Sequence, residues 1–322
     1  MGCFTCGEEV YKTNIPIQPY AYKPPFTVTH LYQVLEDSNK IASFTIATGL
    51  FISYSVPHVE SFPSWFGTAQ FHSALYICGG LLPNSNEFSS KNIQIITAAQ
   101  PFRVTERATM SEGKCSMGIR TISDCTFLVV GGYNEKVLSA VEQYNVNANE
   151  WISKGNLNIA RYNSGVCTFS GRYIYVAGGC TIENNEEKLV RVIERCDMVK
   201  INVEWIIVPI YQSEWEVSMN FGFFQSSQTE ILICGGYKDC ITNEIGKNIC
   251  LYDVTKGVIR TIGELSRNEV FTSGFYYGNE NEMYGFGVTG SVYSYNARIR
   301  QWNDFSREVR SNEKAILINV NN

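Results

Sequence analysis

The chain has 322 residues, of which 44% are hydrophobic and 18% charged. Its net charge is −5 and no long Lys or Arg run occurs, which argues against a surface that follows nucleic-acid phosphates. No apolar stretch is long enough to cross a bilayer, and no secretory signal is recognisable. The 11 cysteines are an odd, scattered set, so we expect a reduced protein in the cytoplasm.

Residues 1–25 differ from the rest of the chain. The stretch "NIPIQPYAYKPP" is rich in proline, which predicts a flexible tail. Gly2, Cys3 and Cys6 are typical of dually acylated proteins, although the myristoylation pattern has Ser or Thr where this chain has Cys6. "CFTCG" could instead be half of a zinc site, but no second CxxC supplies the other two ligands, so we predict no metal. Membrane association is expected only if this terminus is acylated.

Residues 26–322 contain a repeat with a period near fifty. The apolar runs "ALYICGG", "TFLVVGG", "RYIYVAGG" and "EILICGG" each end in two glycines, and "EMYGFG" is a fifth copy with the doublet broken. A chain with similar segments at such even spacing is built from stacked or radial repeats. The doublets are Gly79 and Gly80, Gly131 and Gly132, Gly178 and Gly179, and Gly235 and Gly236.

A second landmark follows each doublet, an aromatic or apolar residue with another apolar residue seven positions later. This spacing predicts a short hairpin with one anchor on each strand. One copy, from Cys196 to Trp205, is two residues longer. The other anchor pairs are Phe44 and Phe51, Ile95 and Phe102, Tyr144 and Trp151, Tyr252 and Ile259, and Tyr295 and Trp302.

An apolar strand ending in two glycines, followed by Tyr and then Trp, resembles the kelch repeat. Arg161 stands where that family favours arginine, and Lys114 lies near the same position of another copy. The resemblance implies an all-β fold, a six-bladed kelch-type β-propeller with one four-stranded blade per repeat. We expect the closing blade to combine three N-terminal strands, beginning at "FTVTHLYQ", with one C-terminal strand at "KAILINV".

The repeat markers have a structural interpretation. A phosphate cradle needs glycines that lead into a helix, whereas these doublets lead into turns and strands, so we expect them to allow close backbone approach. The anchors Tyr144, Trp151, Trp205, Tyr252, Tyr295 and Trp302 are expected to fill the space between blades. His30, His58 and His72 lack the spacing of a zinc site. We therefore predict no cofactor and no catalytic residues.

Function is expected in the loops of one propeller face, within residues 57–67, 81–91, 133–136, 180–188, 207–218 and 237–247. Such loops carry binding residues while the blades hold them in place. The aromatic candidates outside the anchor pattern are Trp65, Tyr133, Trp215 and Tyr237. Glu183, Glu186 and Glu187 would form a negative rim that selects a basic partner.

The predicted function is a non-catalytic, monomeric scaffold or adaptor that binds other proteins and not nucleic acid. Kelch proteins also act as substrate receptors of ubiquitin ligases, usually with a further domain ahead of the propeller, and about 25 residues precede the repeats here. A sugar-type enzyme that uses the central channel is the other alternative. Ionisable residues converging on the channel mouth would favour the enzyme, and an open aromatic and polar surface would favour protein binding.

Overall fold

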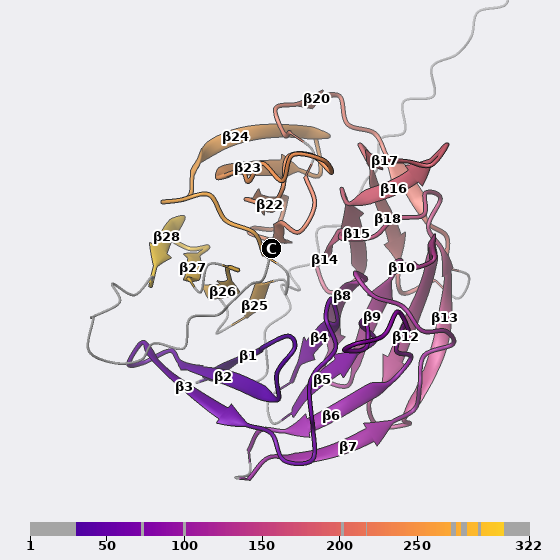
Figure 1. Cartoon of the computed structure of the whole chain (residues 1–322). Helices are drawn as coiled ribbons and strands as arrows, with labels where there is room; N and C mark the ends of the chain where they lie inside the picture. The colour runs from indigo at the N-terminus through magenta and orange to yellow at the C-terminus, as the bar shows by residue number, and fades with distance from the viewer. Residues whose placement is uncertain are drawn as a thin grey trace, which may run out of the picture.

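The protein is a six-bladed β-propeller. The computed structural model describes residues 30–71, 74–98, 101–200, 203–216, 218–271, 275–277, 282–288 and 291–305, and these residues form strands, turns and loops. Figure 1 views the ring along its central axis and shows the blades following one another in chain order. The predicted all-β fold and its six blades are confirmed.

Each blade is an antiparallel sheet whose strands are joined in sequence. Blade I contains β1 (His30–Val34), β2 (Lys40–Thr45) and β3 (Leu50–Ser55). Blade II contains β4 (Gly67–Gln70), β5 (Ala74–Cys78), β6 (Asn92–Ile96) and β7 (Arg103–Arg107). Blade III contains β8 (Gly118–Ser123), β9 (Thr126–Val130), β12 (Ala140–Asn145) and β13 (Glu150–Asn156).

Blade IV contains β14 (Gly165–Phe169), β15 (Tyr173–Ala177), β18 (Ile193–Asp197) and β19 (Ile206–Val208). Blade V contains β21 (Gly222–Gln225), β22 (Glu230–Cys234), β23 (Asn248–Asp253) and β24 (Val258–Glu264), with β20 (Gln212–Ser213) parallel to β24 at its outer edge. Blade VI contains β25 (Phe275–Tyr277), β26 (Glu282–Phe286), β27 (Val292–Asn296) and β28 (Gln301–Asp304). Two small hairpins, β10 (Tyr133–Asn134) with β11 (Lys136–Val137) and β16 (Cys180–Glu183) with β17 (Glu186–Leu189), extend from blades III and IV.

The hydrophobic core lies between the blades. Six clusters of buried side chains each combine residues of two neighbouring blades, as Phe127 of blade III does with Tyr76 of blade II. One of them closes the ring, because Leu31 and Phe44 of blade I pack with Tyr284 of blade VI. Each blade therefore buries both faces against its neighbours, and the fold is stable only as a ring.

The glycine doublets connect neighbouring blades, as their placement at strand ends predicts. The first glycine of each doublet has a positive φ, and a Cβ there would lie 2.2–2.4 Å from a carbonyl oxygen of the next blade. The second glycine donates its N–H to the same segment, as Gly132 does to the Arg161 carbonyl at 2.9 Å. Only glycine combines this conformation with such close backbone approach.

Most anchor pairs face each other across neighbouring strands. Tyr144 lies opposite Trp151, and Tyr295 lies opposite Trp302. Ile95 is an exception, because it pairs with Val104 while Phe102 precedes β7, although both Ile95 and Phe102 are buried in one cluster.

Several sequence predictions fall outside the described residues. They are the tail 1–25 with Gly2, Cys3 and Cys6, the first residues of "FTVTHLYQ", His72, and the C-terminal strand "KAILINV" of the closing blade. Among the described residues, blade I is the three-stranded sheet expected from the N-terminal part of that blade. The described part of the chain also holds no helix of the length and apolarity that a membrane span requires.

Candidate functional site

One face of the ring is assembled from two kinds of loop. In blades II to V, the residue after each glycine doublet forms a β-bridge to the segment that precedes the innermost strand of the same blade. In blades II, III, IV and V these bridges join Ser64 to Leu81, Cys115 to Tyr133, Tyr162 to Cys180, and Met219 to Tyr237. The loops expected to carry function therefore lie together on this face, which we call the bridged face.

Backbone hydrogen bonds link the loops of the bridged face from blade to blade. The N–H of Ser116 donates to the carbonyl of Trp65 at 2.8 Å, Asn163 donates to Ser116 at 2.8 Å, and Asn220 donates to Asn163 at 3.1 Å. Each of these four residues lies two positions before an innermost strand and has a φ between 52° and 54°. Just before the innermost strands of blades II to V, these four residues thus form a hydrogen-bonded series of left-handed residues, which we call the left-handed series.

Trp65 is the unusual member of the left-handed series. Asn tolerates the left-handed conformation, and a small Ser is accommodated, but a bulky aromatic residue is strained there. Its side chain is 55% exposed, so burial does not account for an aromatic residue at this position. Strain of this kind accumulates at functional sites, which makes Trp65 the strongest of the sequence candidates.

Two carboxylates lie beside Trp65. The Trp65 N–H donates to Glu36 Oε1 at 2.9 Å, and the Ser64 hydroxyl donates to Asp37 Oδ1 at 2.8 Å. Glu36 and Asp37 are exposed residues of the loop between β1 and β2. Removal of water from around its carboxyl group raises the pKa of Glu36; the hydrogen bond from the Trp65 N–H opposes this, and the charge of Asp37 adds to it. We call Trp65, Glu36 and Asp37 the Trp65 corner.

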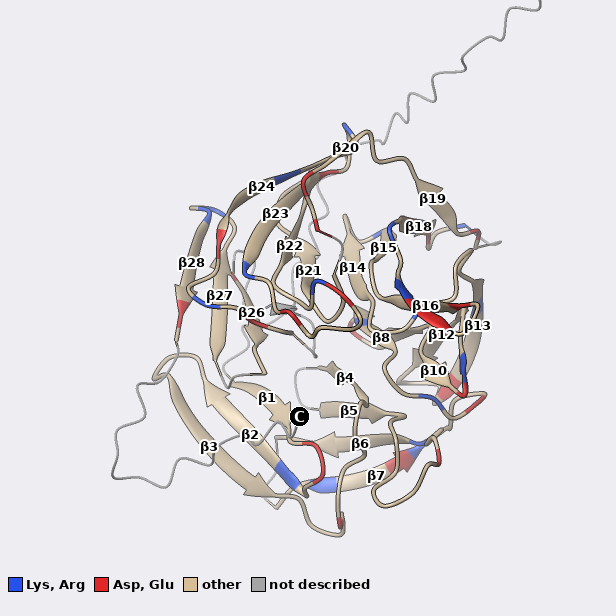
Figure 2. Cartoon of the chain, turned by 45° about the horizontal axis from the view of Figure 1, so that its top comes forward, with Lys and Arg blue, Asp and Glu red and all other residues tan. Residues whose placement is uncertain are grey.

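The three glutamates predicted as a negative rim belong to the β16–β17 hairpin, shown with its acidic residues in Figure 2. Asn184 and Asn185 both have positive φ, as a two-residue hairpin turn requires, so this segment is a regular hairpin rather than an irregular loop. Glu187 accepts a hydrogen bond from the Tyr162 hydroxyl at 2.5 Å. Burial and this bond raise the pKa of Tyr162.

The other two glutamates lie opposite each other. Glu183 pairs with Glu186 across the hairpin, and Lys188 reduces their repulsion through an ion pair of 3.1 Å with Glu183. Both glutamates are exposed. The hairpin thus keeps a net negative charge on the bridged face.

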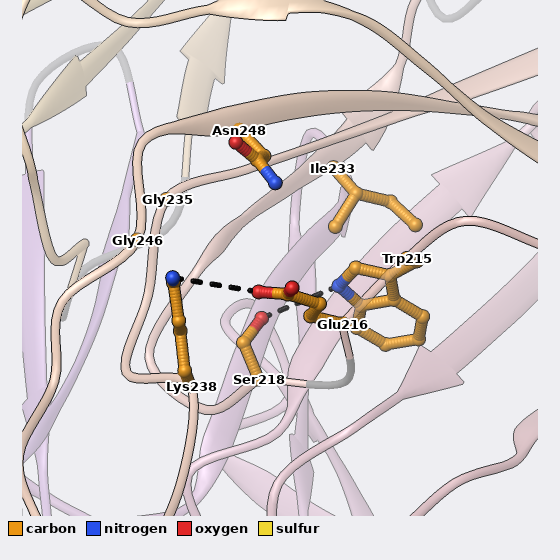
Figure 3. A pocket seen from close by; sticks show the side chains of 8 residues that line it. All are labelled: Trp215, Glu216, Ser218, Ile233, Gly235, Lys238, Gly246 and Asn248. Carbon is orange, nitrogen blue, oxygen red and sulfur yellow. Dashed lines mark hydrogen bonds and ion pairs between the residues drawn. The ribbon is translucent and has the colours of Figure 1, made fainter.

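Trp215 is buried rather than presented to solvent. Its side chain is 9% exposed and packs with Phe221 and Phe223 between blades IV and V. It borders a small recess, in which Lys238 contacts Glu216 at 3.6 Å (Figure 3). Lys238 also pairs with Glu244 at 2.7 Å. The recess has room for about one water molecule, so it is too small for an organic ligand.

Tyr133 and Tyr237 are half-buried on the bridged face. The Tyr133 ring lies between those of Phe88 and Tyr162, with centroids 5.9 Å from each. Tyr237 is held by bridges to Met219 and Ile245. Both therefore form part of the surface without standing out from it as Trp65 does.

Two buried ion pairs join loops of the bridged face to strands of the blades. Lys114 pairs with Glu142, and Arg161 pairs with Glu194 at 2.5 Å, at equivalent positions of blades III and IV. Burial would raise the pKa of Glu142, but the hydrogen bond and charge of Lys114 outweigh it and lower that pKa. Burial lowers the pKa of Arg161 despite the charge of Glu194. Because both pairs are buried, we assign them a role in holding the blades and their loops together.

Sequence reasoning missed Glu36 and Asp37. They follow a strand that lacks the glycine doublet, so the repeat did not mark their loop as part of the bridged face. A signal was present, because "EDSN" has the composition of a turn between two apolar strands. Their closeness to Trp65, which belongs to the next blade, could not be read from sequence spacing.

Comparison of the sequence with models of known protein families and with curated proteins finds no match. The functional argument therefore rests on the repeat and on the geometry of the bridged face.

Proposed function

We propose that this protein is a kelch-type propeller that binds other proteins through its bridged face, and that the face selects a basic segment. The observation that carries the proposal is the Trp65 corner, where an exposed aromatic residue at a strained position binds Glu36 through its backbone N–H and the preceding Ser64 binds Asp37. An aromatic face and carboxylates are the groups that bind a Lys or Arg side chain, by cation–π and charge-assisted contacts.

The charge of the surrounding loops supports a basic partner. Glu183, Glu186, Glu216 and Glu244 are exposed on the same face, and the nearby Lys188 and Lys238 are already paired with glutamates. A face with a net negative charge attracts a basic partner and disfavours an acidic one. The buried ion pairs serve the scaffold, which favours binding over catalysis at this face.

The proposal is tested with a phage library of random 12-residue peptides panned against the full-length protein. We expect the enriched peptides to be rich in Lys and Arg. One enriched peptide is then titrated against three variants. Trp65→Asn removes the indole, and the double variant Glu36→Gln with Asp37→Asn removes both charges while keeping the hydrogen-bond acceptors. Ile299→Asn is the control, since Ile299 is 63% exposed in the turn between β27 and β28, outside the bridged face.

We expect the peptide affinity to fall about tenfold or more in the first two variants and to stay unchanged in Ile299→Asn, because a hot-spot residue contributes about 2 kcal/mol. Trp65→Asn should remain folded, since relief of about 1–2 kcal/mol of left-handed strain offsets the lost partial burial of the ring. Enrichment of acidic or neutral peptides, or equal binding by wild type and Trp65→Asn, would refute the proposal.

A further inference from the structure

Two cysteines of different blades meet on the bridged face. Cys180 is the first residue of β16 in blade IV, and Cys240 lies in the loop between β22 and β23 of blade V, 60 residues further along the chain. Their Sγ atoms are 2.8 Å apart. Non-bonded carbon atoms rest about 3.5–4.0 Å apart and sulfur is larger, whereas a disulfide bond measures about 2.05 Å. The two sulfur atoms are therefore closer than free thiols prefer.

The environment of the pair is asymmetric. Cys180 is fully buried, and its backbone is held by two hydrogen bonds of 2.9 Å with Tyr162. The Met219 sulfur, 3.3 Å from Cys180 Sγ, also contacts the inner thiol. Cys240 is partly exposed, in a loop whose Asp239 carboxylate accepts the N–H of Ile241 at 2.7 Å. An oxidant can thus reach Cys240 first, while Cys180 is held in place to react with it.

We propose that Cys180 and Cys240 form a reversible disulfide that ties the β16–β17 hairpin of blade IV to the 237–247 loop of blade V. A peroxide is the oxidant: the Cys240 thiolate attacks one peroxide oxygen, the O–O bond breaks, and Cys240 becomes a sulfenic acid with release of water. Cys180 then attacks the Cys240 sulfur, and a second water leaves as the S–S bond forms. The two thiols lose two electrons and two protons to the peroxide, and a dithiol reductant restores both thiols.

The protonation state of the pair sets the rate of this oxidation. Burial raises the pKa of both thiols. The thiolate is the reacting species, so little of Cys240 reacts at neutral pH and the reaction should accelerate as the pH rises. The link is consequently a slow response to sustained oxidation.

The chain offers a direct test by mass spectrometry. The full-length reduced protein is treated with hydrogen peroxide, its free thiols are alkylated, and it is digested with trypsin without reductant. Cleavage after Lys and Arg isolates each cysteine in a peptide of its own, Tyr173–Lys188 for Cys180 and Asp239–Lys247 for Cys240. We expect these two peptides joined, at a mass two hydrogen atoms below their sum, and separated again by a dithiol.

Two variants serve as controls. Cys240→Ser should abolish the joined peptide, and because Cys240 is partly exposed this variant should fold. Cys125→Ser changes another partly exposed cysteine, which contacts the Ser123 hydroxyl at 3.8 Å, and should leave the joined peptide unchanged. Predominant oxidation of Cys240 without a bond to Cys180, Cys240 joined chiefly to another cysteine, or no reaction of the folded protein with peroxide would each overturn the proposal. The test does not depend on whether the bridged face binds a peptide.

Discussion

The buried pair of Lys114 and Glu142 allows the sharpest test of how the scaffold is held. Lys114 is fully buried, and 7% of the Glu142 side chain is exposed. Glu142 also accepts the Ser111 N–H at 3.1 Å, so its carboxylate is held at two points of the loop between β7 and β8. Lys114→Met keeps the size of the side chain and removes its charge, which leaves Glu142 buried without a counter-charge.

The burial of the pair sets the expected magnitude. Removing one partner of a buried ion pair costs about 3–5 kcal/mol, because the remaining charge is uncompensated. The exposed pair Lys91 and Glu106 is the matched control, since its atoms are 2.7 Å apart but its side chains are 56% and 66% exposed. Lys91→Met should therefore lower the free energy of unfolding by less than about 1 kcal/mol. The double variant Lys114→Met with Glu142→Gln should cost less than Lys114→Met alone, because no unpaired charge is left.

The pH dependence distinguishes loss of the counter-charge from loss of packing. In the wild type the folded-state pKa of Glu142 is lowered below its ordinary value of 4.5. Its contribution to stability is therefore complete above about pH 4.5 and is lost as the pH falls through the folded-state pKa. In Lys114→Met, burial alone should raise the pKa of Glu142, so protonation then stabilises the fold. The difference in stability between wild type and variant should shrink from pH 7 to pH 4.

Urea denaturation followed by circular dichroism at pH 7, 5.5 and 4 measures these differences. Lys114→Met and Lys91→Met are compared with wild type under the same conditions. A Lys114→Met cost below about 1 kcal/mol would refute the reasoning. A cost that does not change with pH would also refute it, because packing loss alone does not titrate.

Three further outcomes follow from the same structure. Gly131→Ala should cost about 3 kcal/mol in urea denaturation, because its Cβ would lie 2.2 Å from the Arg161 carbonyl oxygen, whereas Gly49→Ala, with the same sign of φ and open space, should cost about 1 kcal/mol. Phe127→Ala should cost about 3–5 kcal/mol, since this fully buried ring joins blades II and III. The affinity for a basic peptide should fall on titration from pH 7 to pH 5, because protonation of Glu36, whose pKa is raised, removes negative charge from the Trp65 corner; an affinity independent of pH would exclude this role of Glu36.

The sequence predicted the ring because the repeat has physical causes that recur in each blade. A glycine with positive φ is needed wherever one blade approaches the next, so doublets such as Gly178 and Gly179 marked the blades reliably. The anchors were equally predictable where they face each other across a hairpin, as Tyr144 and Trp151 do. In the Ile95 copy the strand pairing is shifted, and Phe102 is nevertheless buried in the same cluster as Ile95.

The functional candidates were less predictable, because exposure depends on the path of a loop rather than on its composition. Trp215 lies in a loop rich in polar residues, yet it turns into the core between blades IV and V. Glu36 and Cys240 acquire their neighbours from other blades, Trp65 and Cys180. Such contacts join segments that sequence spacing keeps far apart.

In the left-handed series, Trp65 occupies a position that the scaffold fills more favourably with another residue. Asn163 and Asn220 adopt the left-handed conformation at little cost in free energy. The stability of the fold therefore does not require Trp65 at the equivalent position. An exposed aromatic side chain at a strained position is a candidate for a functional role, and the nearby carboxylates of Glu36 and Asp37 are the reason that we propose cation binding there. We expect Trp65→Asn to have a higher free energy of unfolding than wild type and to lose its affinity for basic peptides. This result would show that Trp65 lowers stability and contributes to binding.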